Sequence, residues 1–162
     1  MLNSDQIRDV WESMIRAETR SLYFADLALK TTRRKQWIAG SVLFLSSGAA
    51  VSIVAKAPVW VATGLSLVVA ATTAYSIFAN LDAATGTLTK LHIQWQQICT
   101  DCEQLWSHTY SDDAEDRLQA IRQREKESSV LALTSAAPYN EKEMIKWERR
   151  VFKLRKLEEQ RA

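Results

Sequence analysis

The chain has 162 residues and a formal net charge of +2, with 21 Lys and Arg against 19 Asp and Glu. Its mean hydropathy of −0.20 is that of a soluble protein, but the charges are segregated: none lies at positions 36–55, and none lies between Lys56 and Asp82. An ionisable group at the centre of a bilayer is costly, so this pattern argues against a wholly soluble fold. Four Gly, two Pro and no sustained strand alternation predict an all-α protein.

Residues 1–35 are expected to form a cytoplasmic N-terminal helix that begins near Asn3 or Ser4, either of which can cap it. Small and apolar residues recur there in steps of three and four, as one face of a helix requires; they are Ile7, Val10, Met14, Ala17, Ser21, Phe24 and Ala28. The spacing predicts that this helix runs directly into the apolar segment that follows.

Residues 36–81 are predicted to form a transmembrane hairpin, with spans at about 37–55 and 59–80. Each run is close to the roughly 20 residues that a helix needs to cross the bilayer core. Pro58 suits the first turn of the returning helix, and Trp37 and Trp60 stand where aromatic rings settle at the headgroups. The alternative is a helical hairpin buried in a soluble protein, but the rest of the chain is too charged to cover it on all sides.

The basic residues indicate the orientation of this hairpin. Lys30, Arg33, Arg34 and Lys35 precede the first span, whereas the turn between the spans holds only Lys56. The positive-inside rule therefore places the N-terminus in the cytoplasm, and an even number of spans returns the C-terminus to the same side.

A polar stripe follows one face of the second span and consists of Ser66, Thr73, Ser76 and Asn80. One interpretation is packing, in which small residues face a neighbouring helix and hydroxyls bond back to the backbone. The other is an oligomeric pore lined by these weakly polar groups. Two helices cannot enclose a pore, so the second interpretation requires a homo-oligomeric bundle. The residues alone leave both open, with packing the commoner outcome.

Residues 82–162 are predicted to be a cytoplasmic helical region with a break near residues 130–140. Its first helix carries an apolar series at heptad spacing, which would pack against the N-terminal helix, against an oligomer partner, or against both. We expect it to act as an oligomerisation seam; its members are Leu88, Leu91, Trp95, Ile98 and Leu105. Asp112 is expected to cap the next helix, with Glu115 three residues on.

The final helix is expected to begin at Asn140, and its basic residues concentrate at 146–156. We single out Lys146, Arg149, Arg150 and Lys153 as a candidate binding site for a nucleotide or oligonucleotide. A solvated surface is the usual fate of such residues, and contact with anionic lipid is a further alternative. The sequence does not separate these three explanations.

Catalytic and metal-binding patterns are sparse. The sequence contains no Gly-rich phosphate loop, no nucleophile elbow and no paired-histidine motif, and only two histidines are available for acid–base work. Cys99 and Cys102 lie between His92 and His108, but this spacing matches no zinc module, and buried cysteines are commonly small apolar residues. We therefore expect no enzyme activity, no bound metal, no cofactor and no structural disulfide.

The layout resembles the SLATT family of two-transmembrane effectors. The residues that carry the resemblance are the Thr-Arg-Arg-Lys segment at 32–35, the two spans with a minimal turn, and the following helix with Leu88, Leu91 and Trp95. The resemblance implies a homo-oligomeric pore or ion channel in the bacterial inner membrane that acts in antiphage defence. It also implies control by a nucleotide signal from a partner nucleotidyltransferase, with membrane depolarisation and growth arrest of the infected cell as the result.

Two other functions stay open from the sequence. The main alternative is a membrane-anchored scaffold or adaptor, in which the spans only associate and the cytoplasmic helices dock a partner protein. A weaker alternative is a membrane-shaping protein whose amphipathic helices lie on lipid.

Overall fold

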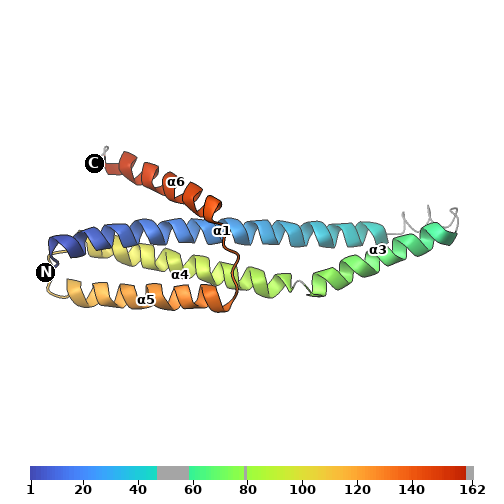
Figure 1. The fold of residues 1–162 in the computed structure, drawn as a ribbon, viewed down its shortest axis with the longest axis horizontal. Helices are drawn as coiled ribbons and strands as arrows, with labels where there is room; N and C mark the ends of the chain where they lie inside the picture. The colour runs from blue at the N-terminus through green and yellow to red at the C-terminus, as the bar shows by residue number, and fades with distance from the viewer. Residues whose placement is uncertain (47–58, 79, 160–162) are drawn as a thin grey trace. The chain divides into compact units, whose positions relative to one another are not determined.

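The described part of the chain is wholly helical in the computed structural model. The structure describes residues 1–46, 59–78 and 80–159, except the side chains of 45–46, 59–62, 65–66, 76–78 and 157–159. Its elements are α1 (Ser4–Ser46), α3 (Val59–Phe78), α4 (Leu81–Ser107), α5 (Ala114–Thr134) and α6 (Glu141–Glu159). The predicted all-α class is confirmed for this part of the chain (Figure 1).

The chain divides into two compact units. The bundle unit comprises Met1–Leu27 and Thr87–Ala162, and the hairpin unit comprises Ala28–Gly86. Each of the helices α1 and α4 has one part in the bundle unit and another part in the hairpin unit.

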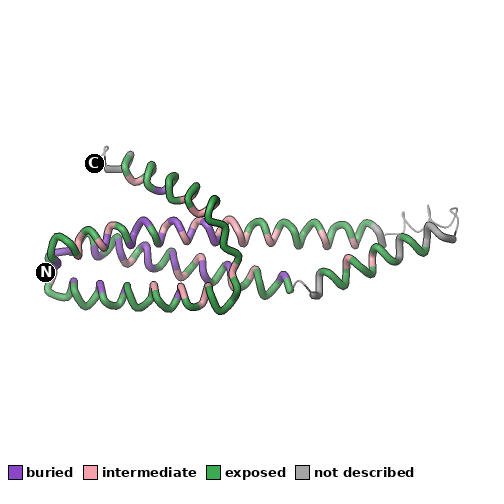
Figure 2. Tube along the Cα trace, in the orientation of Figure 1, coloured by how far each residue is buried: buried purple, intermediate pink, exposed green. Residues whose placement is uncertain are grey.

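The core of the bundle unit lies where the first part of α1 faces α4. Both helices bury one continuous face, visible as the purple segments in Figure 2. The fully or nearly fully buried side chains there are Val10, Met14, Ala17, Tyr23 and Phe24 on α1 and Leu88, Leu91, Trp95, Ile98, Cys102 and Leu105 on α4. Their spacing of three and four residues is that of a helix face, so burial of apolar area drives these helices together.

The helix α5 lies beside α1 and α4 and adds a narrower apolar contact, with Ala114, Leu118, Ile121 and Ser128 buried (Figure 1). Ion pairs supplement this contact at the surface. Arg122 pairs with Asp9 of α1, and Arg124 pairs with Asp101 of α4. Because exposed ion pairs contribute little, the apolar residues provide most of the attachment.

Side-chain caps mark two of the helix starts. The Asn3 side chain accepts a hydrogen bond from the backbone N–H of Gln6, whose side chain accepts one from the Asn3 N–H, both at 2.8 Å. This reciprocal arrangement is a capping box. At the start of α6, the Asn140 side chain accepts from the backbone N–H groups of Lys142 and Glu143. The predicted caps at Asn3 and Asn140 are therefore confirmed.

The start of α5 differs from the prediction. Asp113 rather than Asp112 occupies the cap position, and its side chain makes no capping hydrogen bond. Instead, its carboxylate accepts a hydrogen bond from the Arg117 side chain at 2.6 Å, one turn into the helix. The connection between α5 and α6 lies within the predicted break at 130–140, because α5 continues to Thr134 and residues 135–140 precede α6.

The hairpin unit consists of the last part of α1, all of α3 and the first residues of α4. The predicted first span begins on α1, but its positions 47–55 lie outside the described residues. The predicted second span corresponds to α3, which ends at Phe78, two residues before the expected boundary. Across the described residues, no helix combines the length and the apolar character needed to cross a membrane.

Candidate functional site

The predicted polar stripe is only partly described. The side chains of Ser66 and Ser76 lie outside the described set. Thr73 is exposed, and its hydroxyl donates to the carbonyl of Val69 at 2.9 Å. A hydroxyl that bonds back to the preceding turn satisfies its own donor and still offers an acceptor outward. Thr73 therefore presents a weakly polar surface without any unpaired donor.

Asn80 lies between α3 and α4 and not on the helix that carries the rest of the stripe. Its φ is 41°, a left-handed conformation that Asn tolerates better than most side chains, and its side chain is exposed. Its carbonyl accepts from the Ala84 N–H at 3.1 Å, which places Asn80 at the cap of α4. The prediction that Asn80 continues the helical stripe of α3 is therefore wrong in this detail.

Two basic side chains of the segment at 32–35 hold the hairpin unit together. Arg34 donates to the Tyr75 hydroxyl of α3, and its guanidinium lies 5.4 Å from the centre of that ring. Lys35 pairs with Asp82 at the start of α4. These contacts connect the last part of α1 to α3 and to the start of α4. These contacts could not be predicted from local sequence, because the partners of Arg34 and Lys35 are more than 40 residues away.

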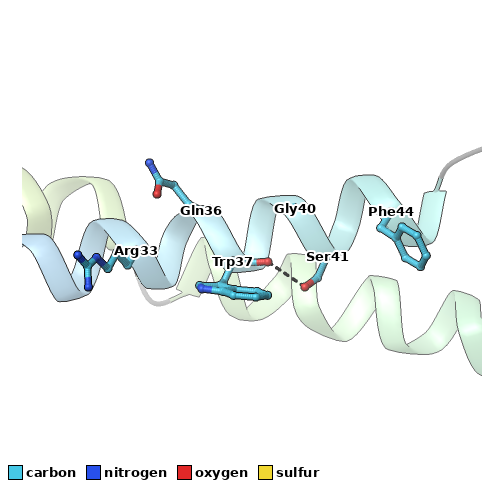
Figure 3. A pocket seen from close by; sticks show the side chains of 6 residues that line it. All are labelled: Arg33, Gln36, Trp37, Gly40, Ser41 and Phe44. Carbon is cyan, nitrogen blue, oxygen red and sulfur yellow. Dashed lines mark hydrogen bonds between the residues drawn. The ribbon is translucent and has the colours of Figure 1, made fainter.

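An open pocket of about 590 Å³ lies along the last part of α1 and is lined by Arg33, Gln36, Trp37, Gly40, Ser41 and Phe44. Figure 3 shows Trp37, Ser41 and Phe44 on one side of the helix and Gln36 pointing away from them. The Ser41 hydroxyl donates to the carbonyl of Trp37 at 2.8 Å. Trp37 and Phe44 are 78% and 74% exposed. The pocket is thus a wide apolar surface rather than an enclosed binding cavity.

The predicted oligomerisation seam is occupied within a single chain. Its five side chains, Leu88, Leu91, Trp95, Ile98 and Leu105, are all between 0% and 3% exposed. They pack in the bundle unit, whose α1 buries the complementary apolar face (Figure 2). The structure therefore shows this face packed against the N-terminal helix, which is one of the outcomes predicted for it.

The helix α6 is attached to the bundle unit by a small set of contacts. Among its described side chains only Val151 is fully buried, at 0% exposure. One turn further, Arg155 donates to Glu18 of α1 at 2.7 Å and also pairs with Glu103 of α4. Burial alone would lower the pKa of Arg155, but these hydrogen bonds and charges raise it overall. Sequence reasoning missed this anchor because nothing local distinguishes Arg155 from its basic neighbours.

The connection between α5 and α6 is held by Tyr23. The side chain is 1% exposed, and its hydroxyl donates to the Pro138 carbonyl at 2.9 Å and accepts from the Asn140 N–H at 2.8 Å. A buried hydroxyl that bridges two backbone groups fixes the path of that connection. Tyr23 therefore sets where α6 begins, a role that the sequence pattern of α1 does not reveal.

The predicted ligand residues form an exposed basic face on α6. Lys146, Arg149, Arg150 and Lys153 are all exposed, and within the described residues none of them forms an ion pair. Arg150 lies over the Trp147 ring at 5.2 Å from its centre. Lys146, Arg149 and Lys153 are therefore accessible to an anion from solution. Arg155 differs from them, because it is paired with Glu18 and Glu103.

The two cysteines are buried thiols without a disulfide. Burial raises the pKa of Cys99 to about 11 and that of Cys102 to about 12. His92 contacts Ser21, and His108 contacts Gln104. Over the described part of the chain, no group of three or more His, Cys, Asp and Glu side chains could hold a metal ion.

No protein-family model matches the chain, and neither a curated protein nor a solved structure matches it.

Proposed function

We propose that the chain is a small membrane effector: a two-helix membrane hairpin carrying a cytoplasmic helical bundle, which assembles into a homo-oligomeric pore or ion channel. The single observation that supports this most directly is the apolar surface of the hairpin unit. Several of its large apolar side chains are exposed: Trp37, Leu43, Phe44 and Leu67 are 68–78% exposed, and Val68 is 54% exposed.

An apolar surface of this kind needs lipid or other helices around it. Monomeric soluble proteins rarely expose contiguous apolar patches beyond a few hundred Å², because water contact with apolar area is unfavourable. The absence of charge from positions 36–55 and 57–81 adds a second reason, since this is the condition for residence in hydrocarbon. Lipid is therefore the first partner that we propose, with both termini on the cytoplasmic side of the bacterial inner membrane.

Self-association is proposed to occur through the hairpin unit. The seam on α4 is already covered by α1 of the same chain, so it offers no free surface for a partner. By contrast, a side chain added at Gly40 or Gly64 would meet nothing within 4 Å. Small residues on open helix faces let a neighbouring helix approach closely in a membrane. An oligomer built this way could bring the Ser66, Thr73 and Ser76 stripe around a central axis.

Control by a nucleotide or oligonucleotide is proposed for the basic face of α6. Lys146, Arg149, Arg150 and Lys153 share an exposed surface on which they form no ion pair with any described residue, and cations of this kind bind phosphates. The resemblance to the SLATT family suggests the source of the signal, a partner nucleotidyltransferase in an antiphage system. It also suggests the outcome, depolarisation and growth arrest.

The pore proposal is tested by ion flux through proteoliposomes that contain the full chain. Thr73→Leu is expected to abolish most of the flux, because it replaces the described polar member of the stripe by an apolar side chain. Thr72→Leu is the matched control: its hydroxyl bonds back to Val68 in the same way, at 2.8 Å, but it lies on a different helix face. Equal flux through both variants would contradict the proposal that the polar stripe lines the pore.

The ligand proposal is tested by titrating a panel of cyclic and linear oligonucleotides against wild-type protein. A variant with Lys146, Arg149, Arg150 and Lys153 all replaced by Gln is expected to lose binding and to lose most of its salt dependence. Replacing Lys90 and Lys126 by Gln is the control, since both are exposed but lie on other helices. Unchanged binding in the quadruple variant would contradict the assignment of this face.

One observation favours the adaptor alternative. Because the α4 seam is covered within one chain, the bundle unit is complete without an oligomer, as a docking module would be. Absence of flux from correctly inserted wild-type protein, combined with capture of a cytosolic partner through α6, would establish the adaptor.

A further inference from the structure

The bundle unit contains a small pocket beside the connection between α5 and α6. It has a volume of about 250 Å³ and is lined by Arg20, Phe24, Trp95, Ser129, Ala132, Leu133, Tyr139 and Met144. Phe24 and Trp95 are buried at 6% and 1% exposure, whereas Leu133 and Tyr139 are 80% and 72% exposed. The pocket thus has a closed apolar side and an accessible rim, and none of its residues belongs to the basic face of α6.

Arg20 is the cation of this pocket. Its guanidinium lies over the Trp95 ring, 4.5 Å from the ring centre, and donates to the Ser129 hydroxyl at 3.2 Å. A guanidinium carries several N–H donors in a fixed fork, yet within the described residues Arg20 makes this one hydrogen bond and no ion pair. A half-buried guanidinium with further donors, next to an apolar cavity, has the chemistry to bind an anion.

The charges around Arg20 leave it incompletely balanced. Burial lowers the pKa of Arg20, while Glu125 and Tyr139 raise it and Arg16 lowers it. Burial likewise raises the pKa of the Glu125 carboxyl, with Asp9 acting in the same direction and Arg16 and Arg20 opposing it. One carboxylate oxygen of Glu125 is buried without a hydrogen-bond partner among the described residues. Glu125 therefore contributes a nearby negative charge but no direct ion pair to Arg20.

We propose that this pocket binds a small organic anion that carries a flat ring system. The carboxylate or phosphate of the ligand accepts from the free donors of Arg20, and its ring occupies the apolar part of the cavity beside Leu133, Tyr139 and Met144. The volume suits a bicyclic ring with one acidic group and is too small for an oligonucleotide. All residues of this pocket belong to the bundle unit, so ligand binding there depends neither on a pore nor on the basic face of α6.

Methyl NMR of methionine provides a direct test on the full chain in detergent micelles. The sequence has three methionines, Met1, Met14 and Met144, so the [¹³C-methyl]Met spectrum is simple. Titration with 2-naphthoate is expected to shift the Met144 signal saturably. Met14, 2% exposed in the core, is expected to stay unchanged and reports that the bundle remains folded. The neutral analogue 2-naphthamide should bind at least about tenfold more weakly, because it cannot form the charge-assisted hydrogen bonds.

Three variants and one control variant make the result specific. Arg20→Gln is expected to weaken naphthoate binding about tenfold or more, and Ala132→Phe is expected to block it by filling the cavity. Glu125→Gln is expected to tighten binding, because it removes a negative charge close to Arg20. Arg149→Gln on the basic face is the control and should leave the titration unchanged. Equal affinity of wild type and Arg20→Gln, or no shift of Met144 with naphthoate, would overturn the proposal.

A second arm identifies the source of the anion. Adenosine 5′-monophosphate carries the same combination of flat ring and acidic group. Displacement of naphthoate by this nucleotide, retained in Arg149→Gln, would assign the site to nucleoside monophosphates. Naphthoate binding without such displacement would assign it to aromatic carboxylates.

Discussion

Replacing Arg155 by Met removes the charged anchor of α6 while keeping much of its apolar stem. In the native structure the Arg155 side chain is 19% exposed, and its acidic partners Glu18 and Glu103 are 24% and 44% exposed. Hydrogen bonds to charged groups contribute roughly 1.5–3 kcal/mol each, but solvent screening reduces this at partly exposed sites. Losing both contacts should therefore cost about 2 kcal/mol, since the two carboxylates keep access to water. That corresponds to about a 30-fold shift in the equilibrium between attached and detached α6.

Hydrogen exchange along α6 measures this equilibrium, because detachment exposes the helix to local unfolding. Amides around Val151 should exchange about 30-fold faster in Arg155→Met than in wild type. Lys156→Met is the matched control, since Lys156 is the next residue, carries the same charge and is exposed. A double-mutant cycle with Glu18→Gln should give a coupling energy of about 1 kcal/mol. Equal exchange in Arg155→Met and Lys156→Met would refute the idea that one side chain anchors α6.

Three further predictions concern groups inside the bundle unit. Tyr23→Phe should lower the free energy of unfolding by about 1–3 kcal/mol in denaturant titrations, because it leaves two backbone groups of the α5–α6 connection without their partner. Cys99 and Cys102 should react slowly with a thiol reagent at pH 8 and quickly after denaturation. Because their pKa values are raised to about 11 and 12, they ionise first in the unfolded state. Stability should therefore fall as pH rises above about 9, and Cys102→Ala should lessen that alkaline loss. Glu125→Gln should stabilise the protein at pH 7, because burial raises the pKa of Glu125. The stabilisation should shrink at acidic pH, where the wild-type carboxyl is protonated. Thermal melts across pH measure this difference, and a stabilisation that grows toward acidic pH would contradict the reasoning.

Local pattern was enough to locate most helices because their signals are short-range. The heptad series from Leu88 to Leu105 predicted a buried face on α4, and the side chains named in it are all buried. The caps at Asn3 and Asn140 were readable because a capping side chain acts within three residues of itself. Where a local signal was duplicated, as at Asp112 and Asp113, the prediction missed by one residue.

The sequence by itself determined the helical class, the buried face of α4, the basic character of α6 and the charge-free run of the hairpin. Only the tertiary structure decided that the α4 face packs against α1 of its own chain, because an apolar stripe specifies burial but not a partner. It also distinguished Arg155, bound to Glu18 and Glu103, from the exposed cations beside it. The same holds for the pocket at Arg20, whose walls come from α1, α4, α5 and α6 with its preceding connection. Such roles arise from contacts between residues far apart in the chain, which no local spacing encodes.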